Sequence, residues 1–284
     1  MGLDYHAYTR DAAFLRDTVL PTARLTLLFY SHHFPRDTSG RLQIAPANSA
    51  EAYWKVKNPL PDIAGLHWVL NRLLALPADA TDAPARASWE KLRAELPPLP
   101  VGEREGKRSL VPYSDWSPVA KPHTPENPEL YAVYPFRHYG LGKPGLDLAL
   151  DTFATRLHKG SGCWRQDAPQ AALLGLTDEV RQHVLTNFTA HEPRHAFPGF
   201  WGDAMDYAPD QDGGGNGELA LQWMLMQCEG RTIRLLPSWP AGWNADFKLH
   251  APFQTTVQAK VRDGKIVDLT VTPKNRKADV IIGR

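Results

Sequence analysis

The chain has 284 residues, enough to bury one large hydrophobic core or two modest ones. Hydrophobic residues make up 43% of it and charged residues 22%, which is typical of a soluble globular protein. The net charge is +1 and no run of like charges occurs, so the sequence indicates neither a nucleic-acid partner nor an anionic membrane surface. No apolar run reaches the roughly 20 residues that span a bilayer.

The start of the chain and its two cysteines carry no sign of export. The opening "MGLDYHAYTRDAAFL" lacks the basic end and the apolar stretch of a secretory signal, so the chain as it stands is expected to be cytoplasmic. Cys163 and Cys228 make neither a disulfide framework nor a zinc set, although a single bridge between them is compatible with the sequence.

Helices joined by proline-rich loops are expected over the first three-quarters of the chain. Residues 11–33 carry apolar side chains at helical spacing, and Pro21 predicts a kink or break there. Residues 62–76 predict a second long helix, with Asp62 at its N-cap. A last helix at 216–228 is apolar on most of its surface and should be buried. Shorter helices are expected at 88–95, 129–141, 146–158, 166–175 and 178–190.

The pattern changes to short strands after about residue 230. "TIRLLPSWP" predicts a strand that ends at prolines, and "ADVIIG" predicts another. "TTVQAKVRDGKIVDLTVTP" alternates apolar and polar residues on both sides of Asp263-Gly264, which predicts a hairpin. We therefore expect a mainly α protein with a β tail: a helical toroid over 1–230, followed by a small antiparallel β-sandwich unit over 231–284. The proline-rich loop 96–127 is too long for a plain connector and should shape a site.

One string resembles a zinc-protease motif. "HEPRH", His191 to His195, fits H-E-x-x-H, and Glu218 lies downstream where a third ligand could come. That chemistry requires both histidines on one face of an unbroken helix, whereas Pro193 between them would cost about 3 kcal/mol in a helix interior. A helix end that runs into a loop is the better interpretation, and no metal site is predicted.

Nucleophile and phosphate motifs are also absent from the sequence. "KGSGCW" lacks the strand–turn–helix context of a nucleophile elbow, so it is interpreted as a glycine-rich loop. "DGGGNG" is not preceded by a strand and has no following Lys-Ser/Thr, so it does not predict a phosphate cradle. No cofactor is predicted.

Carboxylates in aromatic surroundings are the better candidates. Glu51 lies in "ANSAEAYW", where apolar neighbours could raise a carboxyl pKa as a general acid requires. Asp212 lies in a glycine-rich stretch before an apolar helix, where the chain can approach a ligand closely, and Asp210 is its neighbour and rival. Taken alone, Glu51 also fits a solvated loop acid, and Asp212 fits a turn-former.

Four blocks in the same order resemble one family. They are "NSAEAYW" with "NPLPDIAGLHWVLNRLL", "ENPELYAVYPF", "TFATRLHKGSGCWRQDAPQAALLGLTDEVRQHVL" and "DQDGGGNGELALQWMLMQCEGRTIRLLPSWPAGW". Together they resemble the C-terminal part of the inverting (α/α)6-barrel, or six-hairpin, glycosidases of glycoside hydrolase family 95, the α-L-fucosidases and α-L-galactosidases, and their relatives. The resemblance places Glu51 on the general acid of that family and Asp212 on its general base.

The resemblance implies cleavage of a glycosidic bond by direct displacement with inversion. Glu51 would protonate the glycosidic oxygen, and Asp212 would take a proton from the attacking water. The two carboxyl groups would then lie roughly 6.5–9.5 Å apart. The candidates for binding the oligosaccharide or glycoside substrate are sugar-stacking tryptophans and polar partners of sugar hydroxyls: Trp54, Glu129, Trp164, Arg165, Asp167, Trp201 and Asp210. Each tryptophan fits a core position equally well, because large aromatic side chains dominate burial.

The sequence departs from the family in three respects. It has no counterpart of the Asn-x-Asn pair that assists the base, the first barrel hairpins would precede Met1, and Glu126 and Glu129 stand where the family has a His-rich segment. Two alternatives therefore stay open: a truncated barrel that binds carbohydrate without turnover, or a hydrolase or lyase of other specificity. Exposed helix faces of a partial toroid would favour a homodimer. Longer relatives are expected to be periplasmic or secreted.

Overall fold

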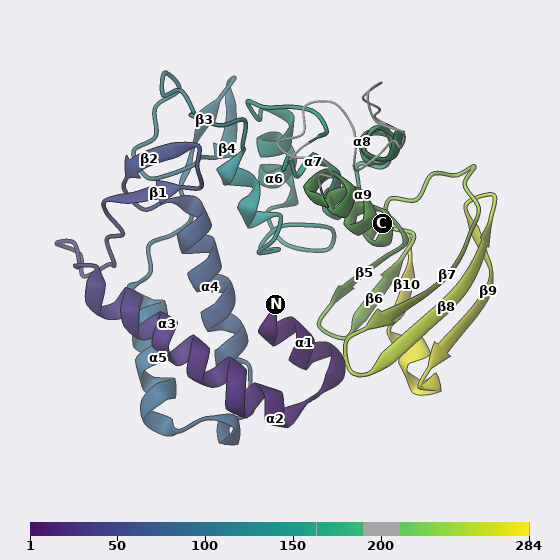
Figure 1. The fold of residues 1–284 in the computed structure, drawn as a ribbon, viewed down its shortest axis with the longest axis horizontal. Coiled ribbons are helices and arrows are strands. Elements are labelled where there is room, and N and C mark those ends of the chain that lie inside the picture. Colours follow the sequence, from purple (N-terminus) through teal and green to yellow (C-terminus); the bar gives the residue numbers. More distant parts are fainter. Residues whose placement is uncertain (163, 190–210, 284) are drawn as a thin grey trace. The chain divides into compact units, whose positions relative to one another are not determined.

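The computed structural model describes residues 1–162, 164–189 and 211–283 (Figure 1). These residues form two compact units. Unit 1 comprises residues 1–6, 11–139 and 147–158, and unit 2 comprises residues 7–10, 140–146 and 159–284. Helices dominate the first part of the chain and small sheets its last part, as the sequence predicts.

The first 33 residues are mostly helical, and the type of helix changes before Pro21. The short helix α1 (Gly2–Thr9) is followed by α2 (Ala12–Phe14), by a π-helical turn at Leu15–Val19 and by α3 (Leu20–His33). In the π turn the Leu20 N–H donates to the carbonyl of Leu15. Pro21 has no N–H to donate, and such a gap in the hydrogen-bond ladder is a recognised cause of local irregularity in a helix. The sequence predicts a kink or break at Pro21, and the structure has a π-helical turn that ends two residues before it.

Helices α3, α4 (Leu60–Leu74) and α5 (Ala83–Glu95) enclose the main core of unit 1. Its buried members include Leu27, Leu70 and Trp89. The opposite side of α3 exposes three large apolar side chains, Leu25, Leu28 and Phe29, at 51–69% of their surface. Apolar groups therefore occur on two sides of this helix. A short 3₁₀ turn at Ala78–Ala80 leads from α4 to α5.

The predicted N-cap of α4 is wrong by three residues. The helix begins at Leu60 after Pro59, so Asp62 lies within the first turn. Asp62 accepts a hydrogen bond from the Tyr30 hydroxyl at 2.6 Å instead of capping the helix. Prolines at positions 59 and 61 can both be accommodated at a helix start, where backbone N–H groups have no partner inside the helix.

Two small hairpins in unit 1 were not expected from the sequence. The first pairs β1 (Ala47–Ser49) with β2 (Tyr53–Val56), and the second pairs β3 (Val101–Arg104) with β4 (Lys107–Leu110). Both central residues of the second turn, Glu105 and Gly106, have positive φ angles of 53° and 73°. That conformation suits a two-residue hairpin. The second hairpin occupies part of the loop that was expected to shape a site.

The helix expected at 129–141 is much shorter in the structure. Only a 3₁₀ turn, η3 (Pro128–Ala132), forms there, and α6 follows at Leu146–Ala154. A small second core packs Leu60 and Ala64 of α4 against Leu110 of β4 and Ala132 of η3. This core fixes η3 and the β3–β4 hairpin on the same side of α4.

Unit 2 begins with three helices packed on one another: α7 (Asp167–Leu174), α8 (Thr177–Thr189) and α9 (Gln211–Leu225). Gly175 ends α7 in the left-handed conformation, with φ of 75°. The predicted start of the last helix at 216 is wrong, because α9 begins at Gln211 and includes the whole glycine run. A Cβ on Gly217 would lie 3.1 Å from the Cβ of Asn187 and 3.2 Å from the Phe188 ring. Glycine at this position therefore lets α8 and α9 approach closely.

The tail of unit 2 contains two three-stranded sheets (Figure 1). One is antiparallel, with β8 (Thr255–Arg262) between β7 (Ala245–Ala251) and β9 (Lys265–Thr272). In the other, β6 (Thr232–Leu235) lies between β5 (Met226–Glu229) and β10 (Val280–Ile282). β10 runs parallel to β6, so the expectation of a purely antiparallel unit is wrong for this strand.

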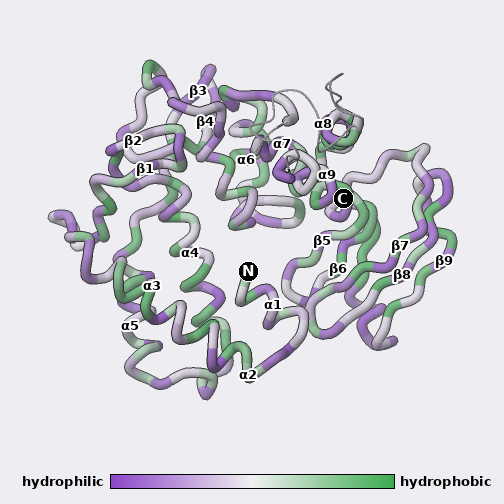
Figure 2. Tube along the Cα trace, in the orientation of Figure 1, coloured by the Kyte–Doolittle hydropathy of each residue, from purple (hydrophilic) through white to green (hydrophobic). Residues whose placement is uncertain are grey.

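Side chains from both sheets build one core, including Ile233, Leu235 and Val257. Hydrophobic and hydrophilic residues alternate along β8 (Figure 2). Every second side chain of this strand is buried. A 3₁₀ turn at Lys274–Asp279 joins β9 to β10. Within the described part of the chain, no helix has both the length and the apolar character needed to cross a membrane.

The predicted hairpin turn at Asp263-Gly264 is confirmed, and it yields a stability test. Both residues have positive φ angles, of 50° and 69°. A Cβ on Gly264 would lie 2.6 Å from the carbonyl oxygen of Ala241. We therefore expect Gly264→Ala to lower the free energy of unfolding by at least about 2 kcal/mol, through left-handed strain together with the clash. Chemical denaturation measures this difference.

Gly230→Ala is the matched control, because Gly230 has a φ of 53° and open space around its Cβ position. It should lose only about 1 kcal/mol, the conformational strain alone. Equal losses in the two variants would contradict the proposed clash.

Candidate active site

Glu51 lies in the turn between β1 and β2 of unit 1, and its side chain is exposed. Backbone strain occurs on both sides of Glu51, because Ala50 in the turn and Lys55 in β2 have positive φ angles of 49° and 57°. Non-glycine residues adopt this conformation only where the surrounding structure holds them, and such strain clusters at functional sites. The turn is therefore a supported structure rather than a loose loop.

The aromatic side chain of Trp54 is hydrogen-bonded to the backbone of Glu51. Its indole N–H donates to the backbone carbonyl of Glu51 at 2.9 Å. The ring stacks on His123, with 4.3 Å between centroids and 22° between planes. Even so, 57% of the Trp54 surface is exposed. An exposed indole that is supported on one face by a second ring is suited to stacking on the apolar face of a ligand ring.

A second carboxylate, that of Glu126, contacts the same turn. Its Oε2 accepts from the backbone N–H of Glu51 at 3.2 Å and from the Thr124 hydroxyl at 3.0 Å. Its Oε1 accepts from the Tyr131 hydroxyl at 3.4 Å. The backbone N–H of His123 donates to the carbonyl of Ala52 at 2.8 Å. Residues 123–126 are thus joined to the Glu51 turn by backbone, side-chain and ring contacts.

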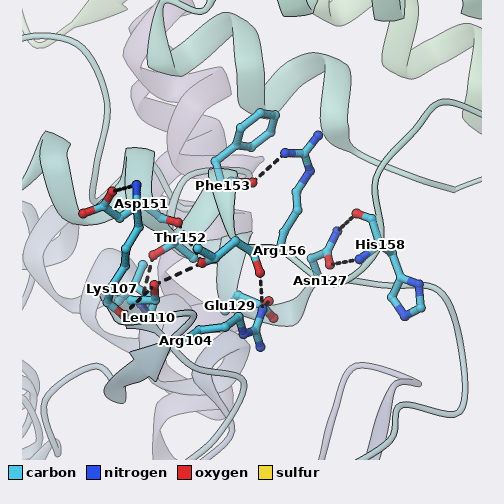
Figure 3. A network of polar contacts seen from close by, with 12 residues as sticks. Arg104, Lys107, Leu110, Asn127, Glu129, Asp151, Thr152, Phe153, Arg156 and His158 are labelled. Carbon is cyan, nitrogen blue, oxygen red and sulfur yellow. Dashed lines mark hydrogen bonds and ion pairs between the residues drawn. The ribbon is translucent and has the colours of Figure 1, made fainter. Parts of the chain in front are cut away.

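Glu129 takes part in a buried ion pair three residues further on. Its carboxylate accepts from the guanidinium of Arg104 at 2.5 Å, and the two side chains are 2% and 10% exposed (Figure 3). The indole of Trp116 covers the guanidinium, with 4.7 Å from its central carbon to the ring centroid. Burial raises the pKa of Glu129, and the attraction of Arg104 offsets this only in part. The carboxylate of Glu129 is therefore paired with a protein side chain and is not exposed to solvent.

Further polar contacts fasten the same segment to α6 and to the residues after it (Figure 3). The side chain of Asn127 donates to the carbonyl of His158 at 2.7 Å and accepts from its N–H at 3.1 Å. The hydroxyl of Thr152 accepts from the backbone N–H of Leu110 at 2.9 Å. These bonds connect η3, β4 and α6 within unit 1.

Asp212 lies in the first turn of α9 in unit 2, and its side chain is exposed. A carboxylate there is also favoured by the helix dipole, so the position has a structural use of its own. The start of α9 is anchored on both sides. Asn187 of α8 donates to the carbonyl of Gly213, and Asn216 donates to the carbonyl of Arg165, each at 3.0 Å.

The other predicted binding residues of unit 2 lie before and at the start of α7. Trp164 and Arg165 are half-buried, whereas Asp167 is 1% exposed and accepts from the backbone N–H of Gly160 at 3.3 Å. In the same glycine-rich loop the Ser161 hydroxyl lies 2.7 Å from Nδ1 of His183. The Asn216 contact therefore brings Arg165 next to the helix that carries Asp212.

The predicted site residues thus form two local groups. Glu51, Trp54 and Glu129 belong to unit 1, and Trp164, Arg165, Asp167 and Asp212 belong to unit 2. Trp201, Asp210, Cys163 and the "HEPRH" string lie outside the described residues. Among the residues that are described, no group of three or more His, Cys, Asp or Glu side chains is placed to hold a metal ion.

Three residues of the unit 1 group escaped the sequence analysis as site members. Arg104, His123 and Glu126 lie in the proline-rich loop 96–127, far from Glu51 in sequence. The local signals were the unusual length of that loop and, for Glu126, its place where the resembling family has a His-rich segment. Their contacts with Trp116, Trp54 and Glu51 depend on the folded arrangement and leave no spacing pattern in the sequence.

No protein-family model matches this sequence, and no curated protein matches it. A solved structure named as a kojibiose phosphorylase from the human microbiome is similar in fold, with a TM-score of 0.54. The identity is 10%, and the match covers 96% of this chain. The chain spans 45% of the length of that structure. At this identity the likeness concerns the fold alone.

The buried pair predicts a large cost when one partner is removed. Replacing Arg104 by Met leaves the Glu129 carboxylate buried without its cation, and we expect the free energy of unfolding to fall by about 3–5 kcal/mol. Lys107→Met is the control, because Lys107 and Asp151 form a pair that is 49% and 39% exposed. This control should cost less than about 1 kcal/mol.

The loss in Arg104→Met should also depend on pH. Without Arg104 the folded-state pKa of Glu129 rises further above its unfolded value. At a pH between these two pKa values the folded state therefore binds more protons than the unfolded state. Stability then decreases as pH rises, and the variant should lose more at about pH 7 than at about pH 4. Urea denaturation at both pH values tests this. A loss that is constant with pH would show that Glu129 is not the group left uncompensated.

Proposed function

We propose that this chain acts on glycosides and cleaves a glycosidic bond with inversion. The observation that carries the proposal is the Glu51 turn, where an exposed carboxyl group adjoins an exposed and supported indole ring. A carboxyl group beside an aromatic platform is a suitable combination for a sugar, because the ring can bind the apolar face of the sugar while the acid reaches the glycosidic oxygen.

In the proposed reaction, protonated Glu51 donates its proton to the glycosidic oxygen as the bond to the anomeric carbon breaks. Ionised Asp212 takes a proton from the water that attacks the opposite face of that carbon. Inversion by this route requires room for one water between the carboxyl groups, which corresponds to roughly 6.5–9.5 Å. The pairing of Glu51 with Asp212 as acid and base rests on the resemblance of the sequence blocks. The more specific proposal, that the chain is similar in function to glycoside hydrolase family 95, rests on the same blocks.

The roles of the remaining residues follow from their exposure. Trp54 is the leading candidate for stacking on the substrate, and the half-buried Trp164 and Arg165 are candidates for further contacts. Glu129 and Asp167 are almost fully buried and already have protein partners. We therefore propose that these two act by holding the site in shape. Trp201 and Asp210 are retained as candidates from the sequence alone.

The fold supports an enzyme of this class through the similar solved structure, whose name is that of a kojibiose phosphorylase. That name also favours a second candidate, phosphorolysis. Phosphate would then replace water as the attacking group, and the product would be a sugar phosphate. A partial (α/α)6 toroid is the arrangement we propose for the helices.

Replacement of the two carboxylates tests the mechanism. Glu51→Gln and Asp212→Asn should each lower kcat by at least about 100-fold, because each removes one proton transfer. Hydrolysis of a panel of nitrophenyl glycosides measures the rates, and proton NMR of the first product shows whether the anomeric configuration is inverted. Two variants with wild-type rates would refute the assignment.

The same assays separate the alternatives. If phosphate is required and a sugar phosphate is formed, the chain is a phosphorylase; loss of activity in Glu51→Gln with activity retained in Asp212→Asn would agree, since phosphate carries its own negative charge. Sugar binding without turnover by the wild type would identify a non-catalytic carbohydrate-binding protein.

Trp54→Ala tests the stacking platform separately from the chemistry. Loss of one stacking ring should weaken sugar binding by about 5- to 10-fold, equivalent to about 1–1.4 kcal/mol, with a smaller effect on kcat. Isothermal titration with the product sugar measures the affinity, and Trp54→Phe should retain most of it. An affinity that is unchanged in Trp54→Ala would exclude Trp54 as a contact.

A further inference from the structure

We propose that Glu126 is a positioning residue, which holds the turn of Glu51 and Trp54 in its working conformation. This inference rests on the proposed function. It adds a residue that the sequence blocks do not assign, and it gives residues 123–126 a definite task. The role is structural support of a reacting group, distinct from contact with the substrate.

The first support is the direction of the hydrogen bonds at Glu126. Both carboxylate oxygens accept from protein donors: Oε2 from the backbone N–H of Glu51 and from Thr124, and Oε1 from Tyr131. Thr124 and Tyr131 lie on either side of Glu126 in the chain, so they hold the carboxylate in place. The bond to Glu51 then transmits that position to the turn. A charged acceptor makes each such bond stronger than one between neutral groups.

The second support is that the same segment contacts the turn at two further points. His123 stacks on Trp54, and its N–H donates to the carbonyl of Ala52. Glu51, Ala52 and Trp54 are therefore each contacted from residues 123–126. A segment that contacts three of the four residues 51–54 fixes the orientation of both the acid and the indole ring.

The third support is the backbone strain in the β1–β2 hairpin. Ala50 and Lys55 have positive φ angles, which are unfavourable for side chains with a Cβ. Such a turn would relax if its outside contacts were removed, since strain persists only where the surroundings determine the conformation. Loss of the Glu126 carboxylate should therefore let the Glu51 side chain move away from the position required for proton transfer.

A pair of variants distinguishes positioning from direct catalysis. Glu126→Ala removes all three acceptor bonds, whereas Glu126→Gln keeps an amide oxygen that can accept from Glu51. We expect Glu126→Ala to lower kcat about 100-fold with little change in KM, as a small misplacement of a catalytic group does. Glu126→Gln should keep most of the activity. Glu103→Ala, at an exposed position of β3, is the control and should behave as wild type.

Hydrogen–deuterium exchange of the peptide covering residues 49–56 supplies a readout that needs no activity. Exchange should be faster in Glu126→Ala than in wild type, and close to wild type in Glu126→Gln. Unchanged exchange in Glu126→Ala would show that the Glu126 contacts do not hold the Glu51 turn. Faster exchange with unchanged kcat would overturn the positioning role.

Two further outcomes also decide the question. If Glu126→Gln is as inactive as Glu126→Ala but keeps wild-type exchange, Glu126 acts through its charge, and the positioning role is overturned. If the wild type cleaves no glycoside, the proposed function is wrong, and the positioning role, which depends on it, is wrong as well. The exchange data then still show whether Glu126 holds the Glu51 turn. Failure of the proposed function can therefore be distinguished from failure of the structural support.

Discussion

The buried ion pair of Arg104 and Glu129 is the interaction on which the unit 1 site depends. Removing two charges from water is costly, and the pair persists because each partner compensates the other and the indole of Trp116 covers the cation. It joins the β3–β4 hairpin to η3. Because η3 begins two residues after Glu126, the pair also fixes the C-terminal end of the segment 123–126 that contacts the Glu51 turn.

Two glutamates three residues apart therefore perform different tasks for a physical reason. Glu129 is buried and needs a full opposite charge, which Arg104 supplies. Glu126 is half-buried, and neutral donors from Thr124, Tyr131 and the backbone of Glu51 are sufficient for it. The sequence shows both as acidic residues of one proline-rich segment. Only the depth of each in the fold separates a structural ion pair from a support of the proposed acid.

Local patterns predicted the elements that local chemistry determines. Asp263-Gly264 could be read as a hairpin turn because its positive φ angles select those residue types. The helix start at Gln211 could not, because glycine lowers helix propensity and the run "GGGNG" is typical of a loop. Tertiary packing decides there: Gly217 allows α8 and α9 to approach, and Asn187 bonds to the carbonyl of Gly213. For the site, Glu51 and Trp54 are sequence neighbours, whereas Glu126 is joined to them only by folding.

The helical position of the glycine run also changes what supports each half of the proposed mechanism. As a loop, the run would have let the backbone pass close to a sugar; in the structure it forms the first turns of α9, and its last glycine, Gly217, packs closely against α8. The glycines therefore add nothing to the assignment of Asp212, which rests on its place in a matching sequence block. Glu51 has independent support from strain, from the adjacent indole and from the Glu126 contact. If phosphate rather than water attacks, the proposed acid is still required and the proposed base is not. The unit 1 group is thus required by both candidate reactions.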